Sequence, residues 1–376
     1  MVLLSKGFEV EIYTCTPTGD AVGFSDQIVA DLQGFVREPD SRNVEYTTPP
    51  LTKYELLCIA LLEPRRQLRQ YLRSLGDYTV MPGSTLALGG SESFHRSDPQ
   101  NPYHGYIENT YGTKVVTASI HINVGIPNTE DLIRACRLVR MEAALYLALS
   151  ASSPFLNGEV TGSHSTRWQM FPKTPIHVPL FSSHRHFIDW TNHQIQLGVM
   201  QNVRHLWSAV RPNGDNRPYD LNRLELRICD LVIDPLALLA ITTLLEMRLQ
   251  MLLADQNLDP LLSKKFSPDE LMAIADQNEI SAARNSLDAE LINWETGEKV
   301  IARDWIWNQY HQVKPRATAQ GVSCFLSPLE KILNQGNEAQ RWLAQVGNGL
   351  TPREVLTTAI AEVAAQEQDL ANNLLS

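Results

Sequence analysis

The chain of 376 residues is 43% hydrophobic, which is enough to fill the core of one large domain or two ordinary ones. Its 42 acidic and 32 basic residues give a formal net charge of -10, which argues against a nucleic-acid backbone or an anionic membrane surface as partner. The five cysteines are scattered and lack Cys-x-x-Cys spacing, which favours free thiols in a cytoplasmic protein over a disulfide framework or a zinc site.

The N-terminus carries no recognisable leader. Met1-Val-Leu-Leu-Ser5 runs directly into the first predicted strand, without a basic region followed by a long apolar run. No uninterrupted apolar run reaches the roughly 18 residues that a membrane span requires. The sequence therefore predicts a soluble, cytoplasmic protein from which no leader is removed.

The first predicted element is a strand with an acidic face. In GFEVEIYT, residues 7–14, side chains alternate between two faces, so Glu9 and Glu11 point together, away from the apolar residues. Helices are predicted over residues 24–34 and 54–75. The second is expected to expose its four arginines, Arg65, Arg66, Arg69 and Arg73.

The middle of the chain alternates loops, strands and one long helix. Residues 82–110 are rich in Gly, Ser, Pro and His and are predicted to form a loop that covers or forms a site. Strands are predicted over residues 115–124 and 223–229. A helix is predicted over residues 128–151, and a second loop around residues 156–186.

From Pro235 onward the pattern is helix after helix. Three helix starts combine a capping hydroxyl, a proline at the first position and a glutamate at the third: Ser267-Pro-Asp-Glu270, Ser327-Pro-Leu-Glu330 and Thr351-Pro-Arg-Glu354. We expect residues 1–376 to form a single catalytic domain. Its sheet-bearing core would span residues 1–234, and a mainly helical part, residues 235–376, would pack on that sheet.

Three further strands repeat the two-faced pattern of residues 7–14. Their polar faces carry Asn43, Glu45 and Thr47, then His121 and Asn123, then Glu225 and Arg227. A solvated outer face of an antiparallel sheet is the ordinary interpretation of such a pattern. These faces, however, contain glutamates, asparagines, a histidine and an arginine but no lysine, which favours a shared site.

Glutamates gathered on one sheet would require cations. At an effective dielectric constant of about 20, two like charges 4 Å apart repel by about 4 kcal/mol, so the group must bind cations or take up protons. Oxygen ligands with one imidazole suit Mg²⁺ or Mn²⁺ better than zinc. Such metals together with an arginine indicate phosphoryl transfer from a nucleotide. Because no Walker A motif is present, metals and arginines would have to hold the phosphates.

Other residues leave alternatives open. The loop histidines are either surface residues or a second metal site, and His186 together with Arg211 could line a substrate pocket. Asn123 is either part of the site or structural. Cys229 is expected to be a buried, inert thiol.

Several segments in chain order resemble glutamate–cysteine ligase, above all the cyanobacterial type, which is related to the plant enzymes and the carboxylate–amine ligases. The segments are Gly7–Glu11, Glu38–Pro50, Ser119–Gly125, Ser152–Phe155 with Thr161-Gly162 and Arg167, Arg211-Pro212 and Leu224–Asp230. The resemblance implies an α+β, glutamine-synthetase-like fold, in which a curved, mainly antiparallel sheet forms a funnel with helices packed outside.

The resemblance also implies a reaction and a set of ligands. ATP would phosphorylate the side-chain carboxylate of L-glutamate, and the amine of L-cysteine would attack the acyl phosphate to give γ-glutamylcysteine, the first step of glutathione biosynthesis. By resemblance, Arg227 and Glu225 are catalytic and Arg167 binds substrate or nucleotide. The implied Mg²⁺ ligands are Glu9, Glu11, Glu38, Glu45, His121 and Glu225.

Two rival functions remain open from the sequence. The first is a ligase that joins glutamate to a different amine, because the acceptor pocket cannot be identified from sequence. The second is a catalytically silent metal- or nucleotide-binding regulator. The presence of both Glu225 and Arg227 argues against the second rival.

Overall fold

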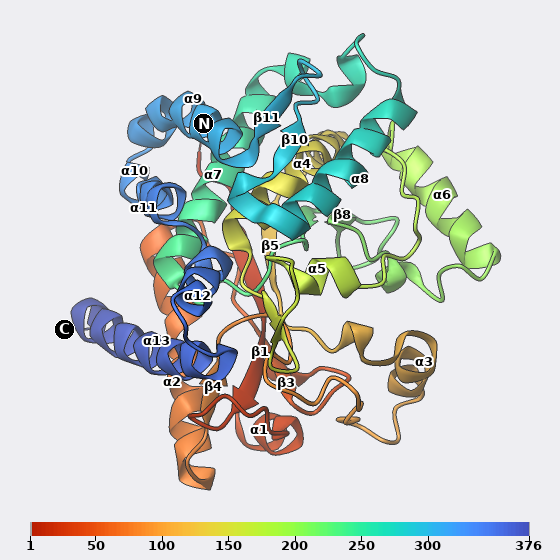
Figure 1. The fold of residues 1–376 in the computed structure, drawn as a ribbon. Helices are drawn as coiled ribbons and strands as arrows, with labels where there is room; N and C mark the ends of the chain where they lie inside the picture. The colour runs from red at the N-terminus through yellow and green to blue at the C-terminus, as the bar shows by residue number, and fades with distance from the viewer. Residues whose placement is uncertain (1, 376) are drawn as a thin grey trace.

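The computed structural model describes residues 2–375, and its centre is one antiparallel sheet (Figure 1). The strand order is β2-β3-β1-β5-β9-β8, and β4 also pairs with β1. The bounds are β1 Lys6–Cys15, β2 Phe35–Arg37, β3 Asn43–Thr47, β4 Thr79–Met81, β5 Ile120–Gly125, β8 Val210–Asn213 and β9 Arg223–Leu226. The four strands with polar faces are therefore consecutive neighbours, which is the arrangement that a shared site requires.

The strand register sets the polar side chains side by side. Glu9 on β1 lies opposite His121 on β5, and Glu11 lies opposite Glu45 on β3. Because side chains on facing positions of neighbouring strands project to the same side, this register gathers the acidic residues on one face. Phe8, Val10 and Ile12 of β1 are buried on the opposite face.

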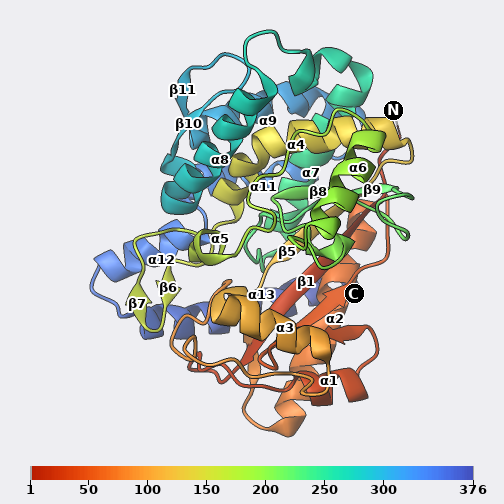
Figure 2. The same cartoon turned by 90° about the vertical axis from the view of Figure 1, so that its right-hand side faces the viewer.

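Helices cover the apolar face and surround the sheet (Figures 1 and 2). The α-helices span α1 Ser25–Asp31, α2 Tyr54–Leu75, α3 Pro102–Tyr111, α4 Thr129–Ser150, α5 Thr166–Met170, α6 His184–Gln196, α7 Pro235–Ala254, α8 Pro268–Asn285, α9 Ala302–Ala319, α10 Ser323–Leu326, α11 Pro328–Gln335, α12 Glu338–Gly347 and α13 Pro352–Leu375. Two hairpins lie apart from the main sheet: β6 Phe155–Leu156 with β7 Glu159–Val160, and β10 Glu290–Ile292 with β11 Lys299–Ile301. Helix α4 contacts β8 and β9, and α2 contacts β1.

The two segments predicted as loops contain regular structure. Helix α3 occupies the end of the 82–110 segment, where Asn101 accepts a hydrogen bond from the Tyr103 backbone and Pro102 takes the first helical position. The loop prediction for this part was wrong, because the Asn-Pro start of a helix was taken for loop composition. The short helix α5 likewise interrupts the segment 156–186, capped by the Ser165 side chain.

Two of the three predicted cap motifs form as expected. Ser267 makes a capping box with Glu270 at the start of α8, and Thr351 and Glu354 exchange hydrogen bonds at the start of α13. Ser327 makes no side-chain cap bond, because α10 runs directly into it and holds it in a helical conformation. A helix does start at Pro328 as predicted, but the expected capping hydrogen bond of the Ser327 hydroxyl is absent.

Helix α2 is more buried than its sequence suggested. Arg65 and Arg69 are only 2% and 6% exposed, and both form ion pairs with Glu367 of α13. The prediction that all four arginines face solvent is thus wrong for these two. A partner 298 positions or more away in the chain leaves no local pattern by which the pairing could be predicted.

Helix α7 is long and apolar enough to cross a membrane. This was not predicted from the sequence, because only uninterrupted apolar runs were considered. Within this fold, however, 78% of its most apolar 18-residue window is buried. It contacts α2, α4 and α9, so its apolar surface is part of the core. The helices after residue 235 thus contact elements of the first 234 residues, and the organisation as one domain stays a prediction.

Candidate functional site

A cavity of about 540 Å³ opens over the polar face of the sheet, and we call it the central cavity. Its lining includes Glu9, Glu11, Glu38, Glu45, Ser119, His121, Tyr103, Phe171, Trp207 and the arginines Arg37, Arg167, Arg204, Arg211, Arg217, Arg223 and Arg227. The glutamates of the lining come from strands β1 and β3 and from the residue after β2, and most arginines come from residues 204–227. The cavity therefore combines a carboxylate floor with guanidinium walls.

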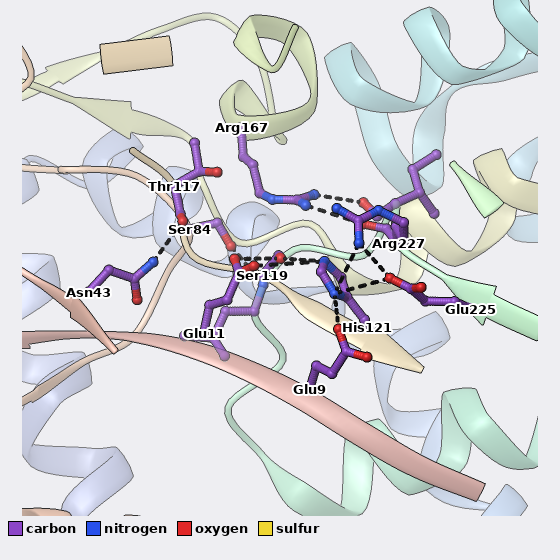
Figure 3. Close-up of polar contacts among 12 residues, drawn as sticks. Glu9, Glu11, Asn43, Ser84, Thr117, Ser119, His121, Arg167, Glu225 and Arg227 are labelled. Atoms are coloured by element: carbon purple, nitrogen blue, oxygen red, sulfur yellow. Dashed lines mark hydrogen bonds and ion pairs between the residues drawn. The ribbon is translucent and has the colours of Figure 1, made fainter. Parts of the chain in front are cut away.

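The first acidic cluster consists of Glu9, His121 and Glu225, from the adjacent strands β1, β5 and β9 (Figure 3). Each offers a ligand atom, and these atoms all lie within 4.8 Å of one another. The His121 Nδ1 atom is 2.9 Å from Glu9 Oε2 and 3.6 Å from Glu225 Oε1. Two carboxylates and an imidazole at these separations can surround one cation.

The second acidic cluster consists of Glu11, Glu38 and Glu45, again with ligand atoms within 4.8 Å of one another. Glu38 follows β2 directly, and Glu45 lies on β3 opposite Glu11. Burial, followed by repulsion from Glu11 and Glu45, raises the pKa of Glu38 well above the ordinary carboxyl value. Burial, followed by repulsion from Glu9 and Glu11, raises the pKa of Glu45 to about 8.

The donor set of the two clusters fits divalent cations. Five carboxylates and one imidazole are the ligand types that Mg²⁺ and Mn²⁺ accept, and no cysteine thiol takes part. Burial, followed by repulsion between the like charges of neighbouring carboxylates, raises the pKa values of Glu38 and Glu45. A cation between these carboxylates would remove that repulsion, so the residues present suit a metal at either cluster.

Glu225 is completely buried beneath two arginines. Arg211 donates to it through Nε at 2.8 Å and through Nη2 at 3.0 Å, and Arg227 Nη1 donates at 2.5 Å. Although burial alone raises the pKa of Glu225, Arg211 and Arg227 outweigh it and hold that pKa well below the ordinary value. Glu225 therefore stays ionised and fixes both guanidinium groups over the first cluster.

Arg167, on α5, lines the central cavity from another direction (Figure 3). Its guanidinium donates to the backbone oxygens of Ile228 at 3.1 Å and Arg227 at 3.2 Å. It also lies 3.9 Å from Asp230, whose carboxylate accepts hydrogen bonds from Ser152, Ser153 and Ser165. Arg167 thus braces the backbone of the strand segment that carries Arg227.

Of the two predicted site residues Asn123 and His186, only Asn123 contacts a residue of the acidic clusters. Asn123 donates to Glu9 Oε1 at 3.2 Å and lines an adjoining cavity of about 620 Å³, which shares Glu9, Thr47 and Arg223 with the central cavity. His186 lies on α6, contacts Ser182 and the Phe181 ring, and does not line the central cavity. The structure therefore does not bring His186 together with the other predicted site residues.

Arg204, Arg217 and Arg223 line the central cavity although the sequence reasoning missed them. A signal was available, because residues 204–227 contain five arginines and no lysine. Planar guanidinium groups, unlike ammonium groups, bind carboxylates and phosphates through paired hydrogen bonds. The aromatic residues of the lining had no comparable signal, since each comes from an irregular segment or a short helix.

Magnesium is expected to stabilise the protein more at high pH than at low pH. Ionising Glu45 costs folding free energy as the pH rises above its ordinary pKa of 4.5, and this cost is complete once the pH passes about 8. Above that pH the ionised carboxylate can also ligate a cation. We expect the rise in melting temperature on adding MgCl₂ to be larger at about pH 9 than at about pH 6.

The matched control for this titration is Glu45→Gln, which keeps the shape of the side chain but cannot ionise. In that variant the difference between the two pH values should shrink. Chelation of the metal by EDTA should reverse the stabilisation in the unmodified chain. An equal magnesium effect at both pH values would contradict the expectation.

Comparison with solved structures identifies the class of fold. The chain superposes on a glutamate–cysteine ligase from Francisella tularensis, solved in complex with AMP, with a TM-score of 0.72 over 98% of this chain and 89% of that chain, at 12% identity. It also superposes on a bifunctional glutathione synthetase from Pasteurella multocida with a TM-score of 0.74, covering 97% of this chain and 53% of that one, at 14% identity. The predicted fold class is confirmed, with an open antiparallel sheet.

Sequence comparison then gives the family. Residues 5–366 match the model of "Glutamate-cysteine ligase family 2(GCS2)". A Rubrobacter xylanophilus protein named "Putative glutamate--cysteine ligase 2-1" is 28% identical over 86% of this chain and 85% of its own length. A Gloeobacter violaceus protein named "Putative glutamate--cysteine ligase 2" is 26% identical over 89% of this chain and 90% of its own length. The chain belongs to glutamate–cysteine ligase family 2, and its family resemblance is confirmed.

Proposed function

We propose that this protein is a cytoplasmic, Mg²⁺-dependent ligase that uses ATP to join the side-chain carboxylate of L-glutamate to the amine of L-cysteine, forming γ-glutamylcysteine. The observation that carries the proposal is the central cavity. Five of the six side chains of the two candidate metal-binding clusters line it, together with a set of arginines, and the sixth, Glu225, is buried behind Arg211 and Arg227. Membership in glutamate–cysteine ligase family 2 supports the same reaction class.

The reaction joins two anions before any bond to nitrogen forms. A carboxylate oxygen of glutamate must approach the γ-phosphorus of ATP, and both groups carry negative charge. Bound Mg²⁺ would supply neutralising positive charge and orient the phosphate oxygens. The carboxylates of Glu9, Glu11, Glu38, Glu45 and Glu225, with the imidazole of His121, are the residues that would hold it.

The arginines would supply fixed positive charge to the reacting groups. Arg227 is held in place by Glu225, so its guanidinium needs little reorganisation when negative charge develops on the transferred phosphoryl group. Arg211 shares this carboxylate and extends the positive wall. Arg204, Arg217 and Arg223 line the same cavity, where they could hold the remaining phosphate or carboxylate oxygens.

The acyl phosphate formed in this way would be lost to water unless the cavity closes over it. Helix α3 and its preceding loop are the proposed cover, since Tyr103 and Ile107 of α3 line the central cavity. Trp207 and Phe171 add apolar surface on another side. The amine of cysteine would then attack the acyl carbon, and phosphate would leave.

The product identifies the reaction. Incubation with L-glutamate, L-cysteine, ATP and MgCl₂ should give γ-glutamylcysteine, ADP and phosphate, detected by the mass of the peptide product. Replacing cysteine by each other amino acid in turn, with phosphate release as the readout, tests the acceptor. Phosphate release that shows no preference for cysteine would favour a ligase with a different amine acceptor. If no amine supports ATP consumption, the result would favour the hypothesis of a non-catalytic regulator.

A further inference from the structure

A separate cavity of about 290 Å³ lies among the C-terminal helices, and we call it the C-terminal cavity. It is bounded by the end of α4, the segment before α7, and helices α11, α12 and α13, which gather on one side of the molecule (Figure 1). It shares no lining residue with the central cavity. Its volume is close to the lower end of the range for small-molecule sites, about 300 Å³.

Charged groups of both signs line this cavity without pairing. They are Asp234, Lys331, Glu338, Arg341 and Glu362. Within residues 2–375, no ion pair joins any two of them. Asp234 caps α7, and Arg341 donates only to the Gly336 backbone oxygen at 3.5 Å. Lys331, Arg341 and Glu362 are exposed, so water solvates them, and the polar groups of a ligand could take the place of that water.

Glu338, the first residue of α12, is the group that most needs a partner. Its side chain makes no hydrogen bond with any residue that the structure describes, although it faces the C-terminal cavity. Burial raises its pKa to about 7, the nearby carboxylates of Asp234 and Glu362 add to that effect, and Arg341 opposes it. A cationic group placed beside Glu338 would favour its ionised form.

The uncharged part of the lining mixes polar side chains with apolar ones. Val232, Ile332, Trp342 and Val363 line the C-terminal cavity, and the Trp342 ring stacks on Phe155 with 5.9 Å between ring centroids. This surface suits the hydrocarbon part of a small molecule that carries charges elsewhere. A purely inorganic ion would leave it uncovered.

We propose that the C-terminal cavity binds a small zwitterion, the chemical class of free amino acids and short peptides. Its ammonium group would lie at Glu338, and its carboxylate would lie at Arg341 and Lys331. Glu338 and Arg341 are three positions apart on α12, so they lie on the same face of that helix. A ligand with both charges can therefore contact both residues.

The C-terminal cavity lies close in the chain to residues that position Arg167 in the central cavity. Ser150 and Ile233, which line the C-terminal cavity, are each three residues from the Ser153–Asp230 hydrogen bond of 2.6 Å. Asp230 in turn faces Arg167. The ligand would contact both of the chain segments that the Ser153–Asp230 hydrogen bond joins. The binding claim itself does not depend on the proposed ligase activity.

Isothermal titration calorimetry of the full chain with glycylglycine tests the proposal. We expect saturable binding that weakens at least about tenfold in Glu338→Gln and in Arg341→Gln, because each variant removes one charge-assisted contact. The control Glu298→Gln changes an exposed glutamate outside the cavity and should bind like the unmodified chain. Methylammonium and acetate, which carry one charge each, should bind more weakly than glycylglycine. Thermal unfolding checks that every variant is folded.

Several outcomes would overturn the proposal. One is the absence of saturable binding to the unmodified chain. Another is unchanged binding in either cavity variant. Binding that survives in Glu338→Gln but is lost in Glu225→Gln would place the peptide in the central cavity instead. Methylammonium binding as tight as that of glycylglycine would reject a zwitterion in favour of a simple cation.

Discussion

Arg227→Ala is expected to lower turnover by at least about 100-fold, which corresponds to about 2.7 kcal/mol of activation free energy. The guanidinium lies over the first acidic cluster, held by the buried Glu225, and its loss removes fixed positive charge from the place where the phosphoryl group is proposed to react. Glu225→Gln should have an effect of the same order, because both arginines lose their ionic partner. The measurement is the steady-state rate of phosphate release with saturating ATP, glutamate and cysteine.

Arg185→Ala is the matched control for that result. Arg185 is an exposed arginine on α6 whose one ion pair among the described residues is with the exposed Asp189, so its loss should leave turnover unchanged. Circular dichroism and the melting temperature would show whether the Arg227 variant keeps its fold. Full activity in both Arg227→Ala and Glu225→Gln, with the fold intact, would contradict the proposed role of this pair.

Glu246→Ala is expected to reduce the free energy of unfolding by about 3–5 kcal/mol, the largest stability effect that we predict for one substitution. Glu246 is fully buried on α7, where it lies 2.8 Å from the buried Lys6 ammonium and 2.6 Å from the Tyr54 hydroxyl. It also accepts a hydrogen bond from the Leu4 backbone at 2.6 Å. Removing it leaves a buried ammonium without its counter-charge.

Denaturant titration measures this change in the free energy of unfolding. Glu63→Ala is the control, because Glu63 forms an exposed pair with Arg66 on α2 and should contribute less than about 1 kcal/mol. A loss of stability that is similar in the two variants would show that burial does not determine the strength of the Lys6–Glu246 pair.

The polar floor of the site could be predicted because strand geometry is local. Alternation along β1 and β5 places Glu9 and His121 on one face whatever the rest of the chain does, and their proximity then needs only that the two strands pair. The position of Glu38 was harder to predict from sequence, because it lies just after a strand of only three residues. Its place in the site depends on its proximity to Glu11 and Glu45, which come from other strands.

Long-range partners explain what could not be predicted. The burial of Arg65 and Arg69 depends on Glu367, which comes from the last helix, and no spacing rule links residues so distant in the chain. His186 was selected because it neighbours another histidine and an arginine in sequence, yet α6 turns it toward Ser182 and Phe181. Sequence proximity of polar residues was a poor guide there, because helix orientation is set by tertiary packing.

The bond between Lys6 and Glu246 couples the beginning of the chain to its helical third. The strand β1 starts at Lys6 and carries both Glu9 and Glu11 three and five positions later. A shift of α7 relative to the sheet would therefore also displace β1, the strand that carries one glutamate of each acidic cluster. For this reason we expect a substitution at this buried ion pair to weaken the proposed cation binding even though it changes none of the proposed ligands.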